Sequence, residues 1–177
     1  MLFKDWRACD ISSTDLELDK AFIYYIHARA WALKGWLGGT HSWLALWSKK
    51  LEKWIVIEST DAETIDVQGA NILHSVPLGW LEKGPFISDR DPRQKWFGAT
   101  PKIIRWQINK LDIDDFISAC DQYPITEFKL ITQNCNTFSS FLIAYFNLIY
   151  LKRPLRSIGF RKVSWWRKTH GIEARIY

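Results

Sequence analysis

Cys135 and His41 are the two residues of this chain whose types and surroundings could together perform nucleophilic catalysis. Cys135 lies in the run Gln-Asn-Cys-Asn-Thr-Phe, which begins at Gln133 and leads into a predicted amphipathic helix. Backbone N–H groups at a helix N-terminus favour negative charge, so a cysteine there can have a pKa well below the free value of about 8.5. His41 begins the strand-like run His-Ser-Trp-Leu-Ala-Leu-Trp and could serve as the base for such a thiol. The pair predicts a cysteine hydrolase or transferase.

The strand that carries the histidine is predicted to form half of a β-hairpin. Two apolar runs, residues 41–48 and 53–60, flank the polar link Lys-Lys-Leu-Glu. Pairing of Ser48 with Lys53 across this turn would fix the register of all the other pairs, because a slip by one residue turns every side chain to the other face.

In that register His41 lies opposite Thr60 and shares a face of the sheet with Glu58. Both Glu58 and Thr60 are therefore candidates for the group that orients the histidine ring. A shift by one residue would place Ser59 there instead, so the hairpin alone leaves the third catalytic member open.

The start of the cysteine helix also offers donors for the oxyanion that forms during acyl transfer. The candidates are the backbone N–H of Cys135 and the side chain of Gln133 or Asn134. Apolar residues follow with helical spacing from Asn136 to about Leu151, so we expect the helix to be buried. This apolar stretch is shorter than the roughly 20 residues needed to cross a bilayer.

The remaining pattern predicts several strands and one further helix. Residues 61–101 hold several Gly and Pro breakers, which predict a long connection with some strand and a loop that covers the substrate. Asp112 is the expected N-cap of the second helix, and Pro124 is its stop. The other predicted elements are a strand at residues 22–31, with a helix as the alternative, a strand at 102–108, a helix at 112–123 and a short strand at 127–132.

The other cysteines and histidines have weaker cases for chemistry. Cys120 is expected to be buried for structural reasons, because it lies on a predicted helix beside apolar residues. His27 and His74 are rival bases for the thiol, and Cys9 has no assigned role. Three cysteines without a second one at metal-ligand spacing argue against a disulfide framework and a zinc site. We therefore expect neither a metal nor an organic cofactor.

Length and composition indicate one domain that spans residues 1–177. Hydrophobic residues make up 47% of the chain and charged residues 24%, which is near the globular average and argues against the disordered and membrane classes. No apolar run of signal-peptide length precedes Asp10. We expect a protein that is cytoplasmic as synthesised, with export as an effector left open.

The C-terminal segment from about residue 152 is basic and rich in tryptophan. Residues 152–175 hold eight Lys and Arg against one acid, Glu173, in a chain of net charge +5. Such a segment favours an anionic surface, such as a membrane or a cell-wall polymer, and Trp165 with Trp166 could meet that surface. A solvated basic face is the simpler interpretation, and no specific nucleic acid is predicted.

The cysteine and histidine motifs resemble those of the circularly permuted papain-like thiol hydrolases, in which the histidine strand precedes the cysteine helix. The run Asn-Cys-Asn-Thr-Phe-Ser is similar to the Asn-Cys-Asn-His-Phe-Ser motif of PPPDE isopeptidases, with Thr137 in place of their histidine. The run His-Ser-Trp-Leu-Ala-Leu-Trp is similar to the histidine strands of PPPDE, LRAT-type and permuted NlpC-like members. Together with Ala-Arg-Ala-Trp at 28–31 and Lys-Trp-Phe-Gly at 95–98, these runs most resemble an uncharacterised bacterial family of that superfamily.

This resemblance implies an α+β papain-like fold, with an antiparallel sheet packed against the cysteine-bearing helix. It also implies a peptide-like or acyl substrate and reaction at an amide, ester or thioester. Our first hypothesis is a hydrolase that cleaves a peptide, isopeptide or cell-wall peptide bond through a thioester on Cys135, with His41 as base and then acid. The second is an LRAT-type acyltransferase or thioesterase acting on lipid or thioester, and the third is an inactive binding module.

Overall fold

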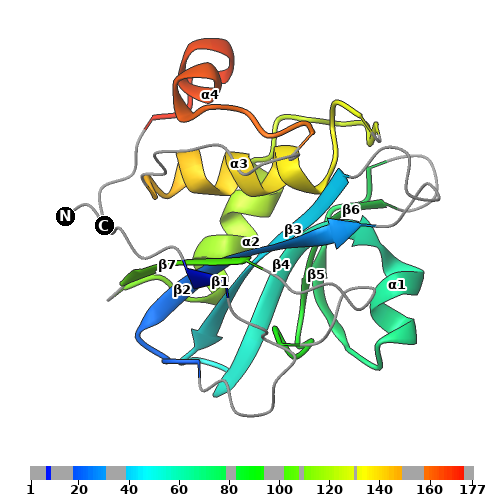
Figure 1. Ribbon diagram of the computed structural model, residues 1–177, viewed down its shortest axis with the longest axis vertical. Coiled ribbons are helices and arrows are strands. Elements are labelled where there is room, and N and C mark those ends of the chain that lie inside the picture. Colours follow the sequence, from blue (N-terminus) through cyan, green and yellow to red (C-terminus); the bar gives the residue numbers. More distant parts are fainter. Residues whose placement is uncertain are drawn as a thin grey trace.

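The computed structural model describes residues 7–8, 18–30, 39–78, 83–93, 102–107, 110–129, 131–148 and 158–173. Within these residues the chain is an α+β fold, in which an antiparallel sheet has the strand order β1-β7-β2-β3-β4-β6-β5. The strands are β1 (Arg7–Ala8), β2 (Phe22–Ala30), β3 (Gly39–Ser48), β4 (Lys53–Asp61), β5 (Ile72–Ser75), β6 (Lys83–Ser88) and β7 (Lys102–Gln107). The helices are α1 (Ala62–Val67), α2 (Ile113–Asp121), α3 (Cys135–Tyr145) and α4 (Val163–His170). Helix α3 packs against β3 and β4, and α4 lies on the outer side of α3 (Figure 1).

The central strands are buried on both faces of the sheet. Side chains alternate along a strand, so Leu44 and Ile57 belong to the core beneath the helices, while Trp43 and Val56 belong to a smaller cluster on the opposite face. All four side chains are fully buried. The helix-covered face also holds Phe138 of α3. This double burial fixes the strand register firmly, because a slip would exchange the two sets of side chains.

The structure confirms the predicted hairpin and its register from Ser48 to Trp43, but the pairing expected of His41 with Thr60 is wrong, because the two strands stop pairing before these residues. β3 pairs antiparallel with β4, with Ser48 opposite Lys53 and Trp43 opposite Glu58. The strands expected at residues 22–31 and 102–108 are present as β2 and β7, and β2 lies between β7 and β3. The strand that carries the candidate base is therefore an interior strand of the sheet.

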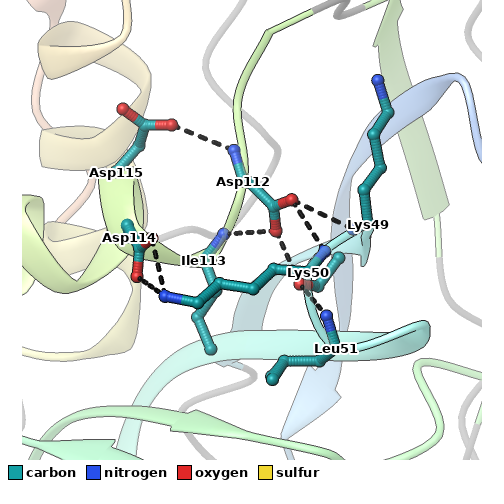
Figure 2. Close-up of polar contacts among 8 residues, drawn as sticks. Lys49, Lys50, Leu51, Asp112, Ile113, Asp114 and Asp115 are labelled. Carbon is teal, nitrogen blue, oxygen red and sulfur yellow. Dashed lines mark hydrogen bonds and ion pairs between the residues drawn. The ribbon is translucent and has the colours of Figure 1, made fainter.

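Asp112 links the turn between β3 and β4 to the start of α2, as Figure 2 shows. Its carboxylate accepts hydrogen bonds from the Ser48 hydroxyl and from two backbone N–H groups of the turn. The same carboxylate caps α2, and the Asp115 carboxylate accepts from Asp112 N at 3.0 Å to complete a capping box. The predicted N-cap is confirmed, and α2 ends at Asp121, before Pro124.

The short strand predicted at residues 127–132 is wrong. The chain turns back on itself there, since Lys129 N donates to Gln133 O at 2.9 Å and Gln133 N donates to Lys129 O at 2.8 Å. Ile131 is 62% exposed, so this apolar side chain does not contribute to the core. Local pairing of these backbone groups replaces the sheet bonds that a strand would need.

Helix α3 ends at Tyr145, earlier than the predicted end near Leu151. Asn147 has φ +53°, a left-handed conformation that asparagine tolerates better than most residues. Leu148 N donates to Ile143 O at 2.8 Å, as in the Schellman motif that commonly closes a helix. The asparagine thus stops the helix although the apolar spacing continues beyond it.

The sequence pattern predicts neither α1 nor α4. The 61–101 connection contains the expected strands, β5 and β6, but also α1. The loop expected to cover the substrate includes residues 94–101, which lie outside the described residues.

None of the described helices has both the length and the apolar character needed to cross a bilayer.

In the basic C-terminal segment, α4 places Trp166 fully buried against α3, where its Nε1–H donates to Ser140 Oγ at 3.0 Å. The expectation that Trp165 and Trp166 together meet an interface is therefore wrong for Trp166. One face of this short helix belongs to the core, because the tryptophan ring packs among the aromatic side chains of the helix-covered face.

Candidate active site

Strands β3 and β4 separate beyond Trp43 and Glu58, and we call the gap between them at this end the fork. Within the described residues, pairing of β3 with β4 ends at Trp43 and Glu58, whereas β4 continues along β6 as far as Asp61. Residues 40–42 of β3 are therefore paired with β2 but not with β4. Backbone groups of these residues can bind a side chain from another element.

The Cys135 thiol occupies this fork. Its sulfur lies 3.9 Å from the carbonyl oxygen of Thr40, and the backbone N–H groups of Ser42 and Asn136 help to lower the pKa of the thiol. A further contact holds the helix against the strand, because the Ser42 hydroxyl donates to Ser139 Oγ at 3.1 Å. The first residue of α3 is thus fixed on the strand that carries the candidate base.

Asn134 makes Cys135 the first residue of α3. The side-chain oxygen of Asn134 accepts from Asn136 N at 2.9 Å and from Thr137 N at 3.3 Å, and Thr137 Oγ1 accepts from Asn134 N at 3.2 Å. The sequence interpretation did not include this capping role. The N–H of Cys135 itself stands at the first helical position, where no intrahelical acceptor exists, so it remains the main-chain candidate for an oxyanion donor.

His41 bridges the thiol and a carboxylate on the neighbouring strand. Glu58 is opposite Trp43, so its carboxylate can reach the histidine ring two residues further along β3. His41 Nε2 donates to Glu58 Oε2 at 2.7 Å. The ring is also close enough to the Cys135 sulfur that each group shifts the pKa of the other. Because Nε2 is engaged by the carboxylate, Nδ1 is the nitrogen left to exchange a proton with the sulfur.

Arg90 is a further member of the site, and the sequence interpretation missed it. Its Nε donates to Glu58 Oε1 at 3.1 Å, and its side chain is fully buried. The Trp43 ring stacks on His41 with 5.6 Å between ring centroids, and the Arg90 guanidinium lies 5.0 Å from the Trp43 ring. Arg90 belongs to the charged run Ser-Asp-Arg-Asp, which has the composition of an exposed turn. Only the pairing of β6 with β4 brings it to the glutamate.

Burial and neighbouring charges set the ionisation of these groups. Burial opposes ionisation of Glu58, but the charge of Arg90 and the contact with His41 outweigh it and lower the pKa of Glu58 from 4.5 to about 2. Burial also opposes protonation of His41, but the charge and hydrogen bond of Cys135, aided by Glu58, raise the pKa of His41 from 6.5 to about 9. Burial likewise opposes the thiolate, yet His41 and two backbone N–H groups hold the pKa of Cys135 below its usual value. Both shifts favour the ion pair of a Cys135 thiolate and a His41 imidazolium over the neutral pair.

No protein-family model, curated protein or solved structure matches this chain. The chemistry open to the site therefore follows from its geometry. A cysteine thiol, a histidine ring and a carboxylate bound to that ring form one row, which can carry out nucleophilic attack and proton transfer. In the described part of the chain, no group of three or more His, Cys, Asp or Glu side chains is arranged to hold a metal ion.

Two of the predicted site residues lie apart from this row. Thr60 pairs with Gly84 of β6, and Glu58 rather than Thr60 is hydrogen-bonded to the His41 ring. Gln133 lines a pocket of about 330 Å³ beside the first turn of α3, and neither member of the thiol and histidine pair lines that pocket. The structure therefore selects Glu58 from the two candidate orienting groups.

Of the two rival histidines, His74 is bound to α2, whereas His27 pairs with Ser42 of β3 and so lies beside the site. His74 Nε2 is hydrogen-bonded to Asp121 Oδ1 of α2 at 2.9 Å, and the His27 ring packs against Tyr25 with 5.6 Å between ring centroids. Cys120 is fully buried, and burial together with the Asp121 charge raises the pKa of its thiol. The prediction that Cys120 is structurally buried is confirmed, while Cys9 lies outside the described residues.

Proposed function

We propose that the chain is a papain-like cysteine hydrolase that cleaves an amide bond through a thioester on Cys135. The observation that carries this proposal is the row of contacts from the Cys135 thiol through His41 to Glu58, which joins a helix N-terminus to two neighbouring strands. A nucleophile, a base and a carboxylate that orients the base are the parts that nucleophilic acyl transfer requires. An antiparallel sheet covered by the cysteine-bearing helix supports the papain-like assignment.

The proposed reaction has two steps. The Cys135 thiolate attacks the carbonyl carbon, and the Cys135 N–H donates to the oxyanion that forms. The His41 imidazolium gives its proton to the leaving amine, so the C–N bond breaks and a thioester remains on the sulfur. Neutral His41 then takes a proton from water while the oxygen attacks the thioester, and the carboxylic acid departs as the thiolate is restored. Glu58 keeps the ring oriented and stabilises its positive charge.

Peptide, isopeptide and cell-wall peptide bonds are the substrates that the sequence resemblance favours. An amine is a poor leaving group and needs a general acid, which a histidine held protonated at neutral pH supplies. Acyl transfer from a lipid is the second candidate, and it depends on a C-terminal segment that meets a membrane. Burial of Trp166 removes part of that surface, although Lys162, Arg167 and Lys168 are exposed and could bind an anionic surface.

Acyl trapping tests this proposal without a known substrate. p-Nitrophenyl acetate transfers its acetyl group to an activated thiol and releases a coloured phenolate. We expect intact-mass and peptide mass spectrometry to find one acetyl group, on Cys135, that is lost with time as water hydrolyses the thioester. Cys135→Ala should abolish this acetylation, and His41→Ala should slow it by about 100-fold.

Cys120→Ala is the matched control, because that cysteine is fully buried in the core and away from the row. Its acetylation rate at Cys135 should equal that of the wild type. Phenolate release that is undiminished in Cys135→Ala would overturn the proposal and favour the inactive binding module. If acetylation occurs as expected, a panel of peptide, isopeptide and thioester substrates then separates hydrolysis of amides from acyl transfer.

A further inference from the structure

The Asn136 side chain connects three segments around the thiol. Its Nδ2 donates to Thr40 O of β3 at 2.8 Å and to Ile158 O of the C-terminal segment at 3.0 Å. The residue is 2% exposed, and its hydrogen bond to Thr40 is buried while the one to Ile158 is partly buried. Both protons of the amide group are therefore used to join the cysteine helix to the histidine strand and to the C-terminal segment.

The orientation of this amide is fixed by its surroundings. A rotation that exchanged Nδ2 with Oδ1 would place the amide oxygen against two carbonyl oxygens, which can only accept hydrogen bonds. The next residue strengthens the same connection, because Thr137 Oγ1 donates to Gly159 O at 3.0 Å. The C-terminal segment thus holds Asn136 in one arrangement.

The carbonyl of Thr40 is also a neighbour of the sulfur, at 3.9 Å from Cys135 Sγ. A carbonyl oxygen at this position can accept the S–H of the neutral thiol, and its partial negative charge repels a thiolate. The Nδ2–H of Asn136 occupies the same oxygen at a much shorter distance. It offsets that partial charge and competes with the thiol for the acceptor.

We propose that Asn136 is a positioning residue that occupies the Thr40 carbonyl and so keeps the neighbouring Cys135 sulfur in its thiolate form. This role rests on the proposed function, since it concerns the same nucleophile. It adds a main-chain element to the activation of the sulfur, beyond the charge of His41. The asparagine that follows the cysteine in the sequence therefore contributes through its side chain as well as through its backbone N–H.

The rate of alkylation of Cys135 by iodoacetamide, followed against pH by peptide mass spectrometry, tests this inference. We expect Asn136→Ala to raise the pH at which Cys135 becomes reactive by about one unit. Asn136→Asp should raise it further, because a carboxylate then faces both the carbonyl and the sulfur. Asn136→Ser is a milder variant whose hydroxyl can donate a single hydrogen bond, and it should fall between the wild type and Asn136→Ala.

Ser139→Ala is the matched control, since Ser139 joins the same helix to the same strand through Ser42 without contacting the sulfur. It should leave the reactive pH unchanged, and circular dichroism should show each variant folded. If the wild type reacts well below pH 8.5 and the folded Asn136 variants react at the same pH, the role of Asn136 is wrong. The proposed function would not be affected by that result. A wild-type thiol that titrates at the ordinary value of about 8.5 would instead remove the activated nucleophile on which the proposed function depends.

Discussion

His41 Nε2 lies 2.7 Å from Glu58 Oε2, although the two residues are diagonal neighbours on β3 and β4 rather than a directly opposed pair. The residue directly opposite Glu58 is Trp43, whose ring stacks on the imidazole. The diagonal contact engages one ring nitrogen with the carboxylate and leaves the other for Cys135. The register of the β3–β4 hairpin thereby determines which nitrogen of the His41 ring is left for Cys135.

Replacement of Glu58 by glutamine should weaken both the site and the fold. The variant loses the negative charge beside His41 and beside the buried Arg90 guanidinium. Breaking one side of a buried ion pair costs about 3 to 5 kcal/mol, so urea unfolding should show a loss of this size. Acetylation of Cys135 should also slow, because the imidazolium is less stable. Asp114→Asn is the matched control, since its ion pair with Lys50 is exposed and should contribute less than about 1 kcal/mol.

Acid should remove the contribution of Glu58 to stability. The pKa of this carboxyl in the folded protein is about 2, below its ordinary value of 4.5. A lowered carboxyl pKa adds stability that is complete above the ordinary value and is lost as the pH falls through the folded value. Urea unfolding from neutral pH down to about 2 should therefore show a loss of a few kcal/mol below pH 4.5 that is absent from Glu58→Gln. Equal pH dependence of the two proteins would count against the buried, ionised carboxylate.

Gly159 should tolerate alanine poorly because it packs against the turn that holds the cysteine. Its φ is +88°, and an added Cβ would lie 2.7 Å from Thr137 Oγ1 and 2.8 Å from Asn134 Oδ1, the atoms of the capping box. Gly171 offers a matched control, since its φ is +62° and an added Cβ would meet nothing within 4 Å. Gly171→Ala should cost about 1 kcal/mol from backbone strain alone.

Gly159→Ala should cost more stability than Gly171→Ala and should also reduce the alkylation rate of Cys135, because the capping box must shift. Urea unfolding and iodoacetamide kinetics on the two variants measure both effects. If the two substitutions were equivalent in both measurements, the C-terminal segment would have no part in holding the cysteine turn.

Alanine at Asp112 should destabilise the fold without altering the site. The carboxylate caps α2 and binds the β3–β4 turn through the buried Ser48 hydroxyl. Loss of a cap together with an unsatisfied buried hydroxyl should cost about 2 kcal/mol in thermal or urea unfolding. Asp114→Ala, an exposed position in the same helical turn, should cost much less. The pH dependence of Cys135 alkylation should be the same in the wild type, Asp112→Ala and Asp114→Ala.

The parts of this site that depend on local pattern can be predicted from the sequence. Alternation along two strands and a short polar link predict the hairpin, and its register brings Glu58 within reach of His41. The position of Cys135 before a run of helical spacing predicts the thiol at a helix N-terminus. These features involve neighbours in the chain or on one hairpin.

The remaining parts depend on contacts between distant segments, which leave no periodic signal. Arg90 lies in a charged run that has the composition of an exposed turn. It becomes a buried partner of Glu58 only when β6 pairs with β4. Trp166 lies in a basic segment, yet its ring is buried against Phe141 of α3 and Tyr123, which follows the end of α2. The turn at Lys129 and Gln133 has the composition of a strand, but its backbone groups pair locally.

The ion pair of Cys135 and His41 is the central claim, and titration of the His41 ring by NMR tests it most directly. The charge of Cys135 is the largest of the contributions that raise the pKa of His41 to about 9. We therefore predict a His41 pKa near 9 in the wild type and a clearly lower value in Cys135→Ala, with the resonance of His74 unchanged between them. A His41 pKa near 6.5 in both proteins would contradict the ion pair and, with it, the proposed nucleophile.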